Sequence, residues 1–375
     1  MLKNNLTLFF AVFTKLTIVI ILLLLPKWMD SYSMTGLNDL CTSLKQKSDY
    51  PGFLIQIHRG SKLIYSCYDG FANIEKQVPI QPNDLFRVGS VTKLMTSVVT
   101  LMLVEKGRLN LDAPIDTLLP KKWIKQFKYS EVITLRQLLG MRSSIHNYTD
   151  DSAYLEKIAK EMTYPWSLPE LIQYGRNHSS STYPGKEFSY SNTNYLLIQL
   201  IIEKATSRSF ESNLQDYLII PLKLKQTYLD NPYKEKRLEV HGYQYVENNK
   251  HGHWVDVTHH NDGRGFADGG VISTAQDLST LMNALFIKKT LLKHSSLQSI
   301  LELKATDNTN EFYGLGIVAI DVEGKKVYGH DGSIPGYKSY VFSEINKDYT
   351  FVALFNTDSF QFDPTPFLKE VLQLE

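Results

Sequence analysis

One serine and one lysine, three residues apart, have the types and the spacing to break an acyl bond. Ser90 and Lys93 stand in the run Ser90-Val91-Thr92-Lys93, ahead of an apolar segment that predicts a long helix. A serine at a helix N-terminus feels the positive end of the helix dipole, and residues three apart share one helix face. A lysine in a partly dry site has a lowered pKa and can take the serine proton. The alternative is a capping serine beside a surface lysine.

A tyrosine and an asparagine form a second candidate pair. Tyr190-Ser191-Asn192 lies in a predicted loop before a helix, where side chains can point into a cleft. A tyrosine beside a lysine loses its proton more easily and can act as a base, and an asparagine amide can orient a substrate carbonyl. An ordinary turn capped by Ser191 or Asn192 is the alternative.

A histidine and a glycine near the C-terminus make the third piece. His330-Asp331-Gly332 ends a predicted short strand, and Gly332 lets a ligand backbone approach closely. The amide of Ser333 can join the amide of Ser90 as an oxyanion hole. A second H-x-G, His58 to Gly60, falls in a predicted hairpin turn and is interpreted as structural.

The elements that must position these residues divide the chain into strands at both ends and helices between. Strands are expected at residues 52–58, 62–68, 315–321, 326–329, 337–343 and 349–356, and helices at 34–46, 90–106, 135–139, 168–174, 193–205, 210–218, 278–286 and 368–374. This order predicts an α+β protein whose sheet uses both chain ends. Residues 34–95 and 301–375 are expected to form the sheet lobe, and residues 96–300 an inserted helical lobe.

The order S-x-x-K, Y-x-N, H-x-G resembles the serine β-lactamase and penicillin-binding protein superfamily, in its class C β-lactamase and DD-carboxypeptidase branch. The flanking runs 86–93, 104–112, 269–278 and 329–337 look like that branch, and the likeness covers about residues 38–372. The resemblance implies a β-lactamase/transpeptidase-like fold, with a five-stranded antiparallel sheet, flanking helices and an all-helical lobe.

The resemblance also implies a role for each matched residue. Ser90 would be acylated, and Lys93 and Tyr190 would share the work of the general base, in an order left open. Asn192, His330 and Gly332 would bind substrate. The amides of Ser90 and Ser333 would hold the oxyanion, and no metal or cofactor is needed.

Two departures from the pattern bear on activity. His330 stands where many relatives have the lysine of K-T-G, and a neutral histidine lacks a fixed charge for a substrate carboxylate. This counts against an efficient β-lactamase. Gly140 to Ile145 replaces the H-T-S-G that often follows the preceding helix, and Arg142 is considered there as a source of the missing charge.

The leading functional hypothesis is a serine hydrolase that releases a C-terminal D-amino acid from cell-wall peptides, in the manner of a D-alanyl-D-alanine carboxypeptidase. An esterase or a weak β-lactamase on the same site is the second. A non-catalytic penicillin-binding sensor is the third. The expected partners are a peptide, D-amino-acid or ester substrate, and β-lactams.

The N-terminus predicts export. Lys3 precedes an apolar stretch that ends in Leu25, so residues 1–33 are interpreted as a signal peptide or a membrane anchor, and the mature chain as periplasmic or secreted. Membrane contact is expected through this segment only. Outside the cytosol Cys41 and Cys67 can form a disulfide; two buried thiols are the alternative.

The composition excludes other classes of partner. Lys and Arg number 40 and Asp and Glu 39, a formal net charge of +1 that gives no bulk electrostatic reason to bind nucleic acid. The two cysteines are too few for a four-cysteine zinc site, and no dinucleotide or phosphate-binding loop motif is present.

Overall fold

The computed structural model describes residues 34–47, 50–125, 127–176, 182–230, 240–247, 252–262 and 264–374. The predicted signal or anchor at 1–33 lies outside these residues. Within them, no helix is both long enough and apolar enough to cross a membrane. Cys41 and Cys67 are both disulfide-bonded.

The chain divides into two compact units, residues 1–47 with 363–375 and residues 48–362. In the first unit, a helix at residues 34–46 and α13 (Thr365–Gln373) pack closely, because a Cβ atom at Gly36 would lie 2.2 Å from a carboxylate oxygen of Glu370. The second unit contains all the candidate site residues.

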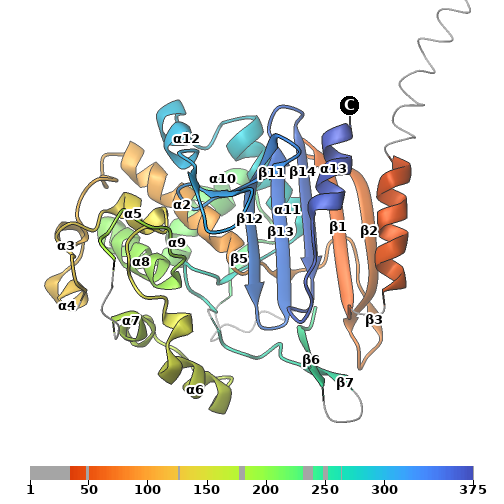
Figure 1. The fold of residues 1–375 in the computed structure, drawn as a ribbon, viewed down its shortest axis with the longest axis horizontal. Coiled ribbons are helices and arrows are strands. Elements are labelled where there is room, and N and C mark those ends of the chain that lie inside the picture. Colours follow the sequence, from red (N-terminus) through yellow and green to blue (C-terminus); the bar gives the residue numbers. More distant parts are fainter. Residues whose placement is uncertain are drawn as a thin grey trace, which may run out of the picture. The chain divides into compact units, whose positions relative to one another are not determined.

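The second unit is built on a nine-stranded antiparallel sheet in the order β3-β2-β1-β14-β13-β12-β11-β10-β9. Its members are β1 (Gly52–Arg59), β2 (Lys62–Asn73), β3 (Val78–Pro79), β9 (Lys304–Ala305), β10 (Glu311–Tyr313), β11 (Val318–Val322), β12 (Lys325–Ile334), β13 (Tyr337–Glu344) and β14 (Tyr349–Phe355). Figure 1 shows β1 and β2 beside the C-terminal strands, and β1 pairs with β14 along its length. The prediction of a sheet from both chain ends is confirmed.

The sheet is wider than the five strands expected. The additional members include the two- and three-residue segments β3, β9 and β10, which pair at the two edges of the sheet. Segments this short have no readable alternation of apolar and polar residues, so the sequence pattern could not reveal them.

Helices gather around α2 (Val91–Glu105), which contacts the helical part and the sheet. α2 packs against α8 (Asn192–Thr206) and α9 (Phe210–Leu214) and also meets β12 and β13. Most of its residues are buried, since both of its sides are covered. Further helices of this group are α3 (Ile115–Leu118), α4 (Lys121–Ile124), α5 (Leu135–Leu139), α6 (Ser152–Lys160), α7 (Leu168–Arg176) and α12 (His294–Ile300).

The range 96–300, expected as one helical lobe, contains more than that lobe. α11 (Ala275–Met282) contacts β1, β13 and β14, so this helix covers the sheet. A hairpin of β6 (Tyr243–Glu247) and β7 (Gly252–Asp256) also interrupts the range.

A small sheet holds the loop that leads into the candidate nucleophile. β4 (Phe86–Arg87) pairs with β8 (Val271–Ser273), which also pairs with β5 (Tyr228–Leu229). Buried Arg87 donates to Asp230 at 2.8 Å, and Arg264 donates to the same carboxylate. This ion-pair group fixes the chain three residues before Ser90.

Replacing Asp230 with Ala should reduce the free energy of unfolding by about 3–5 kcal/mol, because Arg87 would remain buried without a compensating charge. The matched control is Asp112→Ala, which removes an exposed partner of Arg136 and should cost at most about 1 kcal/mol. Urea unfolding of both variants measures the difference. Equal losses would contradict the assignment of Arg87 and Asp230 as a buried, interdependent pair.

Candidate active site

Lys93 is the centre of the candidate site. Its side chain is 0% exposed, and its Nζ donates to Ser90 Oγ at 3.0 Å, to Asn192 Oδ1 at 2.6 Å and to the carbonyl oxygen of Asp268 at 2.6 Å. The three oxygens come from the start of α2, the start of α8 and the loop before β8. Three segments far apart in the sequence therefore meet on one nitrogen.

Ser90 does not behave as a capping serine. It precedes the first residue of α2, but its hydroxyl makes no cap hydrogen bond to the helix. The hydroxyl instead accepts from the lysine one turn on, as the S-x-x-K spacing predicts. The alternative of a capping serine with a surface lysine is wrong for this chain.

Burial shifts the pKa of Lys93 and that of Tyr190 away from their charged forms. Loss of water lowers the pKa of Lys93 to about 8, against the opposing charges of Asp268 and Asp331. Loss of water raises the pKa of Tyr190 well above its usual value, although a hydrogen bond with Ser90 acts in the other direction. At neutral pH, deprotonating Lys93 is therefore much easier than deprotonating Tyr190, and the geometry favours Lys93 as the base.

Tyr190 and Asn192 both belong to the site. The Lys93 Nζ lies 5.0 Å from the centroid of the Tyr190 ring, within cation–π range. Asn192 uses its Oδ1 for Lys93 and its Nδ2 for Thr149 Oγ1 at 3.3 Å. Ser191 caps nothing and donates to the carbonyl oxygen of His146, so this turn is shaped by its neighbours.

Two glycines let the chain segments that carry Ser90 and Ser333 touch. A Cβ atom at Gly332 would lie 2.1 Å from Val88 O and 2.9 Å from Ser90 N, and one at Gly89 would lie 3.0 Å from Ser333 N. The loop before α2 and strand β12 are thus in backbone contact. Ser90 and Ser333 line the same cavity, as an oxyanion hole requires. The close approach expected of a ligand at Gly332 is made by the chain itself.

His330 lies beneath the site. Its ring is 1% exposed and is not among the residues that line the cavity. Nδ1 donates to the carbonyl oxygen of Asp331 at 2.5 Å, so Nε2 accepts from the Tyr313 hydroxyl at 3.2 Å. Burial, with the nearby charge of Lys93, lowers the pKa of His330 to about 3, which leaves it neutral. His330 holds Tyr313, whose ring packs edge-on against Tyr190, and a contact of His330 with substrate stays a prediction.

The cavity beside Ser90 has a volume of about 160 Å³. Besides Ser90, Asn192 and Ser333 it is lined by Tyr148, Thr149, Asp262, Asp268, Gly269 and Ile334. No motif in the sequence points to Tyr148 or Asp268 as a site residue. Asp268 stands 175 positions from Lys93, so no motif spacing connects the two residues.

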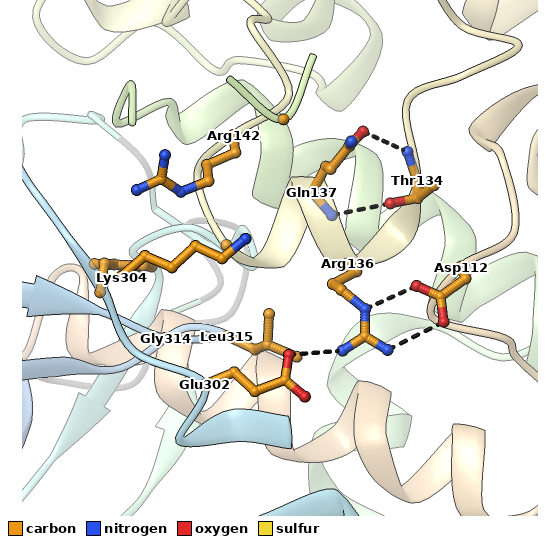
Figure 2. A pocket seen from close by; sticks show the side chains of 12 residues that line it. Asp112, Thr134, Arg136, Gln137, Arg142, Glu302, Lys304, Gly314 and Leu315 are labelled. Carbon is orange, nitrogen blue, oxygen red and sulfur yellow. Dashed lines mark hydrogen bonds and ion pairs between the residues drawn. The ribbon is translucent and has the colours of Figure 1, made fainter. Parts of the chain in front are cut away.

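Arg142 lines a different pocket, of about 280 Å³. Figure 2 shows its side chain there with Lys304, while Arg136 is held by Asp112 and Glu302. The Arg142 guanidinium donates to the carbonyl oxygens of Ala305 at 2.9 Å and Lys186 at 3.4 Å. Arg142 therefore does not supply the positive charge that the Ser90 cavity lacks.

A serine hydroxyl bonded to a buried lysine, with two backbone segments meeting at one cavity, is an arrangement that suits acyl transfer through a covalent serine ester. The sequence model of the family described as Beta-lactamase matches residues 37–372. The chain belongs to the Beta-lactamase family, and the resemblance found in its motifs is confirmed.

Curated relatives are similar over different shares of their length. The chain is 25% identical over 340 residues to Penicillin-binding protein 4* of Bacillus subtilis, covering 86% of this chain and 71% of that protein. It is 30% identical over 201 residues to Protein flp of Staphylococcus aureus, covering 53% of this chain but only 39% of that protein.

Solved structures share the fold. A D-stereospecific amidohydrolase from Streptomyces sp. superposes with a TM-score of 0.77 at 28% identity, over 87% of this chain and 95% of that one. A penicillin-binding protein homologue from Pyrococcus abyssi gives 0.78 at 24% identity, over 90% and 77%. The β-lactamase/transpeptidase-like α+β fold is thereby confirmed.

The rate of Ser90 labelling by a fluorophosphonate should rise with pH and level off with a midpoint near 8. The reason is that only the neutral amine of Lys93, present above its pKa, can take the serine proton. Lys93→Ala should lower the rate by about 10²–10⁴-fold, the usual contribution of a general base. Tyr190→Phe should keep the midpoint. A midpoint that survives in Lys93→Ala and disappears in Tyr190→Phe would assign the base to Tyr190.

Replacing Gly332 with Ala should separate the two amides, because the new Cβ would collide with Val88 O. We expect acylation of Ser90 to slow by about 10²–10³-fold, the cost of an oxyanion donor. Gly324→Ala is the control for backbone strain away from the site, because Gly324 has a φ of +83° but its Cβ would meet nothing within 4 Å. Stopped-flow acylation together with circular dichroism would separate lost chemistry from lost fold; equal rates in the two folded variants would contradict the role of Gly332.

Proposed function

We propose that this chain is an exported serine hydrolase that cleaves amide bonds of D-amino-acid peptides, in the manner of a D-alanyl-D-alanine carboxypeptidase in cell-wall turnover. The observation that carries the proposal is the contact of Lys93 Nζ with Ser90 Oγ at 3.0 Å inside a buried site. The apolar N-terminal segment supports the export part of the proposal.

The chemistry follows from the positions of four groups. Lys93 takes the Ser90 proton as Oγ forms a bond to the substrate carbonyl carbon, and the Ser90 and Ser333 amides hold the resulting oxyanion. Lys93 then gives the proton to the leaving amine as the carbon–nitrogen bond breaks. Lys93 then deprotonates a water molecule, whose oxygen bonds to the carbonyl carbon of the serine ester. The proton passes from Lys93 to Ser90 Oγ as the carbon–oxygen bond breaks and the acid leaves.

A D-amino acid amidase is the second candidate, for a specific reason. The cavity lining contains two carboxyl groups and no Lys, Arg or His, so a terminal carboxylate on the substrate finds no cation there. The similarity to a D-stereospecific amidohydrolase, at 28% identity, supports the same candidate. The neutral His330 likewise speaks against an efficient β-lactamase.

Replacing Ser90 with Ala should reduce D-alanine release from an N-acylated D-Ala-D-Ala peptide by about 10⁴-fold or more, because the nucleophile is lost. It should also abolish the mass adduct with benzylpenicillin. Ser61→Ala, at an exposed serine in the β1–β2 turn, is the control.

The same measurements separate the rival functions. A stable penicillin adduct with no turnover of any substrate would mark a sensor. Hydrolysis of short-chain nitrophenyl esters alone would mark an esterase. An adduct that persists at full strength in Ser90→Ala would overturn the proposal.

A further inference from the structure

One wall of the Ser90 cavity is acidic. Among the residues that line it, Asp262 and Asp268 are the only ionisable carboxyl groups, and no cationic side chain lines it. The nearest cation, Lys93, binds the backbone carbonyl of Asp268 and not its carboxylate. The cavity therefore presents negative charge beside the nucleophile.

Asp268 is a buried carboxylate with an unused acceptor. Its side chain is 3% exposed, and its Oδ2 accepts from the Tyr148 hydroxyl at 2.9 Å. Its Oδ1 is buried and has no hydrogen-bond partner in the described part of the chain. Buried carboxylate oxygens are normally hydrogen-bonded, so an acceptor without a partner, on a residue that lines a cavity, points to a donor from outside the chain.

Asp262 lines the same cavity and also accepts a hydrogen bond from a tyrosine. Its Oδ1 accepts from the Tyr154 hydroxyl, and no ion pair of Asp262 or Asp268 is found among the described residues. The Tyr148 and Tyr154 rings pack edge-on, 5.1 Å apart. Two packed tyrosines thus orient two carboxylates toward one space.

The backbone of Asp268 lies beside the candidate nucleophile. Lys93 Nζ bridges Ser90 Oγ at 3.0 Å and Asp268 O at 2.6 Å, so the nucleophile and this aspartate are adjacent. In an amino acid, the amine nitrogen is two bonds from the carbonyl carbon. Ser90, Asp262 and Asp268 line one cavity of about 160 Å³, so an α-amine on the residue that acylates Ser90 enters the same cavity as the two carboxyl groups.

We propose that Asp262 and Asp268 form a subsite for the protonated α-amine of the acyl residue, which makes the enzyme selective for substrates with a free amino terminus. Ammonium is a compact cation with three donors, and it fits paired carboxylates that lack a cation. A metal is the less suitable occupant, because in the described ranges no three His, Cys, Asp or Glu side chains gather as a metal site. The inference rests on the proposed acyl-enzyme hydrolase, and it favours the amidase candidate over the carboxypeptidase, because the acyl residue of a carboxypeptidase substrate has no free amine.

The test compares two substrates that differ only at the amine, D-alanine p-nitroanilide and N-acetyl-D-alanine p-nitroanilide. Acetylation removes the charge, so kcat/KM should favour the free amine by about 10-fold or more, the effect of losing one charged hydrogen bond. Asp262→Asn and Asp268→Asn should each reduce this ratio by about 10-fold. The ratio cancels any change in the reactivity of Lys93, which both substrates use equally.

Asp331→Asn is the matched control. Asp331 also raises the pKa of Lys93 but does not line the cavity, so its removal should change both substrates alike and leave the ratio intact. If Asp268→Asn does not fold, the Asp262→Asn variant, at a half-buried position, provides the same comparison of the two substrates. A second measurement needs no turnover. D-Alaninamide should protect Ser90 from fluorophosphonate better than N-acetyl-D-alaninamide does, because only the first has a free amine for the subsite.

The outcomes separate the two proposals. Labelling of Ser90 with no preference for the free amine, or a preference unchanged in both aspartate variants, would overturn the subsite and leave the hydrolase intact. If the folded chain does not react at Ser90 with fluorophosphonate, penicillin or either anilide, the proposed hydrolase is wrong. If neither amide protects Ser90 from fluorophosphonate, the proposed subsite is wrong.

Discussion

The removal of Lys93 from water is the constraint on which the rest of the site depends. An amine with 0% exposure must find its hydrogen-bond partners inside the protein, and here it has three oxygens from three chain segments. That requirement holds three segments together: the buried start of α2, the start of α8 and the loop before β8. The geometry that satisfies the lysine also places its nitrogen on the nucleophile.

Burial favours the neutral form of the titratable groups near Ser90. It lowers the pKa of Lys93 and of His330 and raises the pKa of Tyr190 and of Asp268, the last to about 6. All four shifts favour the neutral forms, because charge is costly away from water. A site of this kind suits proton transfer at a neutral amine. Its acidic wall, in a cavity lined by no cationic side chain, suits a cationic substrate better than an anionic one.

Much of the fold could be predicted because its main elements have clear periodicity. The β1–β2 hairpin, α5, α8 and the C-terminal strands all lie within a few residues of their expected positions. The short edge strands, the β6–β7 hairpin and the packing of α11 on the sheet were not foreseen. Edge strands of two or three residues exist only through their pairing partners, and the face that a helix covers depends on contacts between distant segments.

The sequence by itself determined the family and the candidate nucleophile, with the lysine one turn behind it and the Tyr-x-Asn loop, because residue types at fixed local spacing carry that information. Only the tertiary structure decided which charged and neutral forms the groups take, since desolvation is a property of the packed chain. It also moved His330 beneath the site, assigned Arg142 to another pocket and brought Asp268 beside Lys93. Such contacts join residues far apart in the chain, so they cannot be predicted from local spacing.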